Sequence, residues 1–211
     1  MTKLLALALA TGAFLPGQTP KPGRWDGVIS LADLKVPFSI ELSIEGSVVS
    51  GAFYNDAQRT VSTGGSLAGG VLKLDFAQHA THLEAKLSGD TLKGTYGGER
   101  FGRHPFEAVA FCTCGDEGEA GPDIAGAWKV EGAMWNLPVQ RKGEETVATL
   151  KRDNGKPVLL LTGRFDGLQF NLKHFDGSRA ALLEIAVGKD GSLDLSLKEP
   201  GQPAKTYRAI R

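Results

Sequence analysis

Two cysteines separated by one residue are the side chains of this sequence best suited to chemistry. Cys112 and Cys114 lie in the segment FCTCGDEGEAGPD, residues 111–123, and are the only two cysteines of the chain. A disulfide at this spacing closes a small strained ring, which is more oxidising than a structural bridge. Copper or zinc would need further ligands, and His104 is the nearest histidine. The pair predicts a redox or metal site, or a local disulfide at a hinge.

The remaining polar residues predict little chemistry. His79 and His82 are three residues apart, which in a strand places them on opposite faces, and we expect both to be solvated. His174 would approach His79 if the two halves of the chain were related by a twofold axis. Glu84 and Glu184 alternate with apolar residues and are expected to face water. No motif of a hydrolase, metalloprotease or nucleotide-binding protein occurs, so outside the cysteine pair the sequence predicts no catalytic residue, cofactor or metal site.

Trp25 and Trp128 are the other candidate site residues, as ligand-stacking or core aromatics. They open two similar stretches, GRWDG at 23–27 and GAWKV at 126–130. A tryptophan beside a strand start commonly packs a core or plugs the bottom of a barrel.

Alternating apolar residues indicate the elements that hold these side chains. In KVPFSIELSI, 35–44, every second residue is apolar, which predicts a strand with one buried face. Pro37 lacks an amide donor, so this strand should lie at an edge or be unpaired on that side. Similar runs are VLKLDF, HLEAKL and TLKGTY, and turn dipeptides such as Gly69-Gly70 and Asp190-Gly191 separate the strands. We therefore predict an all-β, antiparallel fold.

Internal similarity divides the chain into two related halves of about ninety residues. Residues 69–96 and 166–197 share the order turn, strand, polar break with a histidine, strand, turn, strand. We expect a first β repeat at 21–111, a Cys/Gly/acidic linker at 112–123 and a second β repeat at 124–211. Each half could close its own barrel or sandwich, or both could share one.

The N-terminal residues 1–20 have the pattern of a secretory signal peptide. Lys3 precedes an apolar run, 4–15, that is too short to span a bilayer comfortably; a buried helix is the alternative. No later run is long enough to span a membrane, so we expect an exported chain with no membrane span after cleavage. The formal net charge is zero, which argues against nucleic acid as a partner.

Several of these stretches together resemble the all-β N-terminal region of exported bacterial TlpA-like thioredoxin-family proteins. They are GRWDG, VPFSIELS, GAFYN, LKLDFAQHATHLEAKLSGDTLKGTY and GRFDGLQFNLKHFDGSRAALLEI, and the resemblance covers roughly residues 23–211. In that family a thioredoxin domain with a CxxC motif follows the β region. The resemblance implies a periplasmic location and, as partner, a C-terminal thioredoxin-like domain or another exported protein.

The family's thiol-disulfide oxidoreductase activity resides in the thioredoxin domain, and no CxxC occurs in this sequence. The resemblance therefore implies a non-catalytic accessory domain that docks or positions a partner, with any oxidoreductase activity belonging to a longer protein. One alternative is a free-standing, lipocalin-like barrel with a small apolar ligand between Trp25, Phe38, Phe76 and Phe170. A second alternative is a minor redox or metal role through the CxC pair.

Overall fold

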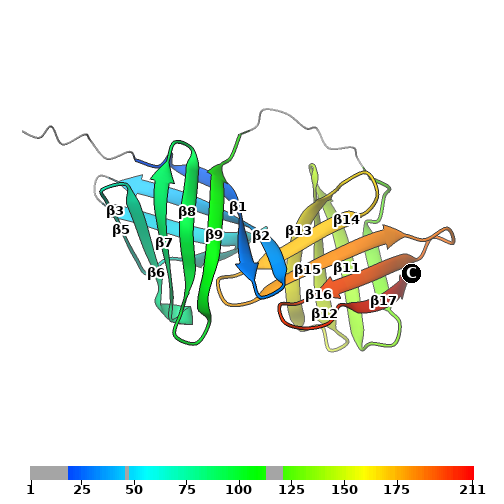
Figure 1. Cartoon of the computed structure of the whole chain (residues 1–211). Coiled ribbons are helices and arrows are strands. Elements are labelled where there is room, and N and C mark those ends of the chain that lie inside the picture. Colours follow the sequence, from blue (N-terminus) through cyan, green and yellow to red (C-terminus); the bar gives the residue numbers. More distant parts are fainter. Residues whose placement is uncertain (1–18, 46–47, 113–120) are drawn as a thin grey trace, which may run out of the picture.

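The chain folds into two all-β halves that lie side by side (Figure 1). The computed structural model describes residues 19–45, 48–112 and 121–211. These residues form strands β1 to β17, and their only helix is a 3-10 turn at Ala77–His79. Within the same ranges no helix has the length and apolar character needed to cross a bilayer. The predicted all-β, antiparallel fold is confirmed, whereas residues 1–18 of the expected signal peptide lie outside the described residues.

The first half is a nine-stranded antiparallel sheet with the order β4-β3-β2-β1-β9-β8-β7-β6-β5. Strict alternation gives the sheet one buried face, as in β7, where Leu83, Ala85 and Leu87 are buried between exposed Glu84 and Lys86. The strands are β1 (Gly23–Leu31), β2 (Leu34–Glu45), β3 (Val48–Asn55), β4 (Gln58–Val61), β5 (Gly64–Ala68), β6 (Val71–Phe76), β7 (Thr81–Ser88), β8 (Thr91–Gly98) and β9 (Gly102–Ala110).

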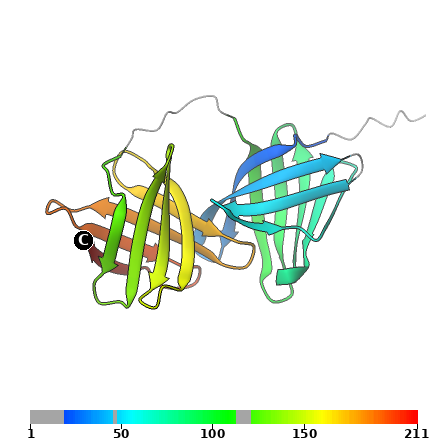
Figure 2. The same ribbon diagram turned by 180° about the vertical axis from the view of Figure 1, so that it is seen from behind.

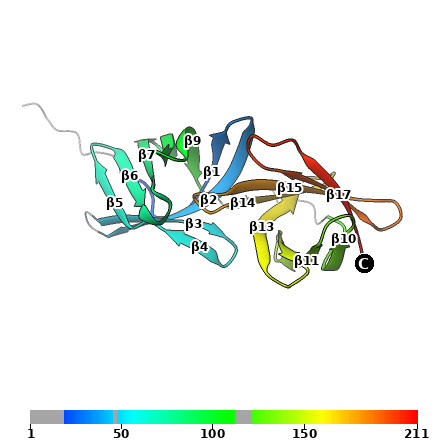
Figure 3. The same cartoon turned by 90° about the horizontal axis from the view of Figure 1, so that it is seen from below.

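This sheet curls until β5 lies against β3 without forming a strand pair with it. The approach is close, since a Cβ added to Gly65 would lie 2.2 Å from the carbonyl oxygen of Val49. The amide of Ser62 donates to the carbonyl of Gly51 at 2.7 Å, where β4 passes into β5. The first half is therefore an incompletely closed barrel (Figure 3).

The second half is a closed barrel of strands β10 to β17 in sequence order. Its ends meet where Lys129 and Val130 pair with Ile210 and Ala209. The strands are β10 (Gly126–Val130), β11 (Trp135–Lys142), β12 (Glu145–Arg152), β13 (Pro157–Phe165), β14 (Phe170–Phe175), β15 (Ala180–Val187), β16 (Leu193–Lys198) and β17 (Lys205–Ile210). Inward side chains, largely leucine, isoleucine, valine and alanine, fill its core.

The two halves repeat the same local structure at their first strands. Trp25 and Trp128 are both buried, and each indole N–H donates at 2.9 Å to a carbonyl four residues earlier, that of Lys21 or Ile124. β14, β15 and β16 follow one another in the second sheet as β6, β7 and β8 do in the first. The similarity noticed in the sequence thus corresponds to equivalent strands.

Pro37 and the turn glycines behave as expected. β2 is an interior strand between β1 and β3, but β3 pairs only with its residues 40–45, so Pro37 has no strand on that side. Gly70 and Gly191 have φ angles of 75° and 80°, which glycine adopts without a steric penalty.

The halves meet where β14 packs across β2 and β3, seen from behind in Figure 2. Phe175, the last residue of β14, shares the outward face of that strand with Asn171 and Lys173. It is nevertheless 1% exposed, because it enters the core of the first half. Its ring centroid lies 4.9 Å from that of Phe53 and 5.6 Å from that of Tyr96.

Buried hydrogen bonds fix this inserted segment, which we call the plug hairpin, residues 174–180. The side-chain amide of Asn55 donates to the carbonyl of Phe175 at 3.1 Å, and its oxygen accepts the amide of Phe175 at 3.1 Å. The hydroxyl of Tyr96 donates to the carbonyl of Gly177 at 2.6 Å. The two halves therefore form separate sheets, and the second contributes Phe175 and Ala180 to the core of the first.

Candidate functional site

The cysteine pair lies at the margin of the described structure. Cys112 follows β9 by two residues and is not a free thiol. Cys114 lies outside the described residues, as does most of the predicted linker. In the ranges that are described, no three histidine, cysteine or carboxylate side chains gather in a way that could hold a metal ion. A redox or metal role for the pair stays a prediction.

The tryptophans and histidines make contacts within the protein. Trp25 is 0% and Trp128 4% exposed, so both rings belong to the cores. His174 is buried, with Nδ1 2.8 Å from the carbonyl oxygen of Leu160 and Nε2 3.5 Å from Asp176 Oδ2. His79 lies beside the plug hairpin, since a Cβ added to Gly177 would be 3.3 Å from its Cδ2.

A cleft of about 460 Å³ opens where the outer faces of the two halves meet, and we call it the seam cleft. Its volume is within the range usual for small-molecule sites. One wall comes from the first half, with Arg24, Asp26, Lys35 and Pro37. The second half supplies the rest, namely Glu145, Gly163, Arg164, Asn171, Leu172, Lys173, Leu182, Leu183 and Glu184.

A hydrogen-bonded chain crosses the seam beneath this cleft. Lys173 Nζ donates to Ser39 Oγ at 2.7 Å, and Ser39 Oγ donates to Asp26 Oδ1 at 2.6 Å. Arg24 Nε also donates to Asp26, at 3.0 and 3.1 Å to the two carboxylate oxygens. Ser39 is only 3% exposed, because β14 covers the outward face of β2, so its hydroxyl is a link in the chain rather than a group presented to a ligand.

Burial changes the protonation behaviour of Lys173. It lowers the pKa of this amine to about 8, because removal from water disfavours the charged form. The carboxylates of Asp26 and Glu145 act in the opposite direction, and the cations of Arg24 and Arg164 add to the lowering. Near neutral pH most of the Lys173 amine is therefore protonated, and it loses its proton at slightly higher pH.

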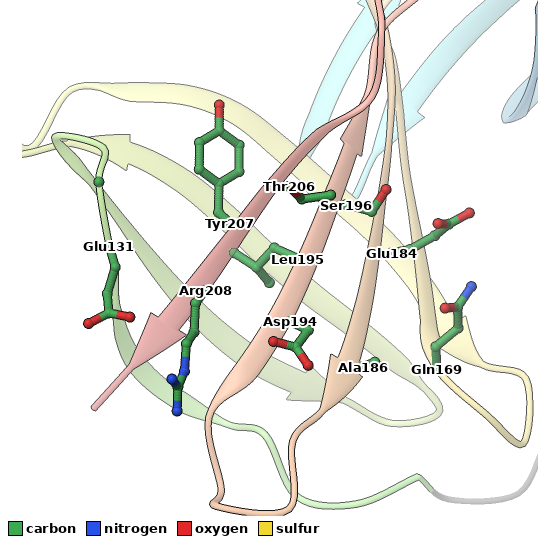
Figure 4. A pocket seen from close by; sticks show the side chains of 11 residues that line it. Glu131, Gln169, Glu184, Ala186, Asp194, Leu195, Ser196, Thr206, Tyr207 and Arg208 are labelled. Atoms are coloured by element: carbon green, nitrogen blue, oxygen red, sulfur yellow. The ribbon is translucent and has the colours of Figure 1, made fainter.

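A second, larger hollow of about 710 Å³ lies on the outer face of the closed barrel (Figure 4). Glu184, Ser196 and Thr206 are direct cross-strand neighbours there and form a polar row over β15, β16 and β17. Arg208 in this hollow is already paired with Asp190. We favour the seam cleft as the site, since it combines partly buried charge with apolar walls, whereas the outer hollow is an ordinary polar sheet face. Glu184 borders both.

Sequence reasoning missed Lys173, Ser39 and Asp26, and expected Glu184 to be solvated. Glu184 is half-buried and paired with Lys198. One signal was available in FNLKHF, 170–175, where the alternation places an aromatic residue, Phe175, in phase with polar Asn171 and Lys173. An aromatic on the polar face of a strand indicates that another element covers that face.

No protein-family model matches the sequence, and no curated protein matches it. The TlpA-like resemblance accordingly stays a prediction.

Proposed function

We propose that the chain is a non-catalytic binding module whose site is the seam cleft. The observation that carries this proposal is the chain Lys173–Ser39–Asp26, which joins the two halves and leaves the lysine on the wall of a ligand-sized hollow. The inward aromatics named for a lipocalin-like site are instead buried in the two cores, where Phe76, for example, stacks on Phe53 with the ring centroids 4.9 Å apart. A site at the seam fits this packing better than one inside a barrel.

Blocking variants test this proposal. Asn171 is an exposed residue of the cleft wall, so Asn171→Trp should fill the cleft, and Thr206→Trp fills the outer hollow as a matched control. A small-molecule fragment library would be screened by NMR against the full chain. We expect hits that shift cleft resonances and are lost in Asn171→Trp but kept in Thr206→Trp. Hits that follow the opposite pattern would move the site to the outer hollow.

As the biological setting of this module we propose the accessory domain of an exported TlpA-like protein. The all-β architecture with two related halves supports this role. In that setting the cleft would face either a thioredoxin-like domain or an exported partner. Crosslinking in the native organism from a photoreactive residue at Lys35, which is exposed on the cleft rim, tests it. Adducts with a thioredoxin-like domain or with another exported protein are expected, and adducts confined to proteins that are not exported would contradict it.

The CxC pair remains a second candidate site. The bonded state of Cys112 supports a local disulfide at the hinge between the halves. Thiol titration with and without reductant measures that state. If a Cys112→Ser/Cys114→Ser variant exchanged disulfides at the same rate as the parent chain, a redox role of the pair would be excluded.

A further inference from the structure

The carboxylates of the seam cleft are all paired within the protein. Asp26 accepts the guanidinium of Arg24 at 3.0 Å, and Glu145 lies 3.6 Å from the same guanidinium. Glu184 is paired with Lys198. Each of these carboxylates therefore has a cationic partner within the protein, although Asp26 and Glu145 share the single charge of Arg24.

The cations of the cleft are not balanced in the same way. Arg164 pairs with Glu144 at 3.1 Å, but among the described residues neither Lys35 nor Lys173 forms an ion pair with a carboxylate. An ammonium group has three donors, and Lys173 uses one of them on Ser39.

The carboxylates of Asp26 and Glu145 act on Lys173 without touching it. The cleft is lined by four cations against three carboxylates, the cations being Arg24, Lys35, Arg164 and Lys173. A partly buried ammonium with no carboxylate in direct contact is unfavourable, so the cleft is complementary to an anion.

The walls beside these amines are apolar. Pro37 is exposed on the side contributed by β2, and Leu182 is half-buried on the side contributed by β15. Leu172 and Leu183 also border the cleft, but their side chains are buried in the core of the second half. A ligand that satisfied both parts of the cleft would carry a negative group at one end and a hydrocarbon body at the other.

We propose that the seam cleft binds a small amphipathic monocarboxylate, with its carboxylate on the Lys173 ammonium and its apolar body against Pro37 and Leu182. Lys35 at the rim adds a second positive charge that steers the anion toward the cleft. This inference rests on the proposed function and adds the class of ligand to it.

The proposal makes ligand binding and Lys173 protonation interdependent. Burial lowers the pKa of Lys173 to about 8 in the empty protein, and a bound carboxylate favours the ammonium form and raises that pKa. The other charges that face it are Asp26, Glu145 and Glu184 on the negative side and Arg24, Arg164 and Lys35 on the positive side. Affinity should therefore fall as the pH rises above about 8.

Octanoate is the probe for the test, measured against the full chain by isothermal titration calorimetry at neutral pH. Octanamide is its neutral isostere, octylamine reverses the charge, and acetate lacks the hydrocarbon body. We expect octanoate to bind and octanamide to bind about tenfold more weakly or worse, the usual effect of losing a charged hydrogen bond. Octylamine and acetate should show no binding. Lys173→Met should weaken octanoate about tenfold, whereas Lys173→Arg should retain most of the affinity.

The outcomes separate this inference from the proposed function. Equal binding of octanoate and octanamide, or unchanged octanoate affinity in Lys173→Met, would overturn the anion assignment and leave a neutral ligand in the cleft. Octanoate binding that survives Asn171→Trp would overturn both, because the ligand would then lie elsewhere. Absence of octanoate binding at millimolar concentration would likewise overturn the anion assignment, and the fragment screen would still decide whether the cleft binds anything. Circular dichroism of each variant confirms that it is folded.

Discussion

The two halves have the same strand plan but close in different ways. Both halves pair their first strand with their last, β1 with β9 and β10 with β17, and in the second half the pairing continues round the whole barrel. In the first half the pairing is interrupted between β4 and β5. There β5 reaches β3 without pairing with it, and the plug hairpin of the second half packs into the core. One sheet is thus completed by its own hydrogen bonds and the other by a neighbour. Both arrangements protect strand edges. Completion by a neighbour, however, makes the first half depend on the second.

The cores differ in a way that matches this dependence. The first core is rich in aromatic rings, with Phe38 and Phe106 stacked at 4.8 Å and Tyr96 edge-on to Phe53 at 5.3 Å. Phe175 from the plug hairpin adds to this cluster. The second core is mainly aliphatic and receives no residue from the first half among those described. We infer that the closed barrel is stable by itself, whereas the first half requires it.

Removal of the Phe175 ring should have the largest effect on the difference between the two halves. Phe175→Ala deletes a fully buried phenylalanine, which costs about 3–5 kcal/mol of unfolding free energy in protein cores. Hydrogen exchange measured by mass spectrometry should show the loss of protection in the first half, although the residue belongs to the second. The matched control is Phe170→Ala on the opposite face of β14, which should affect the second half. Unchanged exchange in the first half of Phe175→Ala would contradict the account.

Loss of the reciprocal amide bonds should have the next largest effect. Asn55→Ala leaves the buried amide and carbonyl of Phe175 without these partners. An unsatisfied buried polar group costs about 1–3 kcal/mol, and denaturant unfolding measures the change. Asn136→Ala, which removes an exposed bond of 3.3 Å to Asp153, should change the free energy of unfolding by less than about 0.5 kcal/mol. Equal effects of the two variants would show that the bonds between Asn55 and the plug hairpin contribute nothing specific to stability.

The hydroxyl of Tyr96 makes a smaller contribution to holding the plug hairpin in the first half. Tyr96→Phe removes the bond to Gly177 and the 2.6 Å contact with Thr81 while keeping the ring in the core. We expect a loss of about 1.5 kcal/mol, measured by thermal unfolding. Burial raises the pKa of Tyr96 well above its usual value, so the loss should not vary between neutral and mildly alkaline pH. Tyr207→Phe in the second half is the control and should have little effect.

Acid should destabilise the plug hairpin by protonating Asp176. Burial alone would raise the pKa of this carboxyl, but hydrogen bonds from His174 and from the amides of Arg179 and Ser178 outweigh it and hold the pKa below its usual range. A folded pKa below the unfolded value of about 3.9 gives stability that is present above that value and lost as the pH falls below it. As the pH falls below about 4, the parent chain should therefore lose about 1 kcal/mol of unfolding free energy through Asp176, and Asp176→Asn should lack this loss. An unchanged profile would contradict this role of Asp176.

Much of the fold could be predicted because alternation is a local property. The run 35–44 and the turn glycines determine strands and hairpins from neighbouring residues alone. The similarity of GRWDG to GAWKV also identified two halves with equivalent first strands. Whether each half closes its own barrel could not be predicted, since closure depends on pairing between residues as distant as Lys129 and Ile210.

The candidate site could not be predicted for the same reason. Lys173 and Ser39 are 134 positions apart in the sequence, and each lies on the outward face of its own strand. Either residue taken alone suggests solvent exposure. Their contact exists because one sheet packs on another, and only the misplaced aromatic Phe175 hinted at that packing. The cysteine pair attracted notice by its spacing, which is a local pattern and indicates nothing about the seam.

The dependence of the first half on the second is tested most directly by following each half separately during unfolding. Trp25 lies in the first core and Trp128 in the second. In the full chain labelled with 5-fluorotryptophan, fluorine NMR through a denaturant titration reports both, with assignments from single Trp→Phe variants. We expect the native Trp25 signal to disappear before or together with that of Trp128. A native Trp25 signal that persists after that of Trp128 has gone would contradict the account.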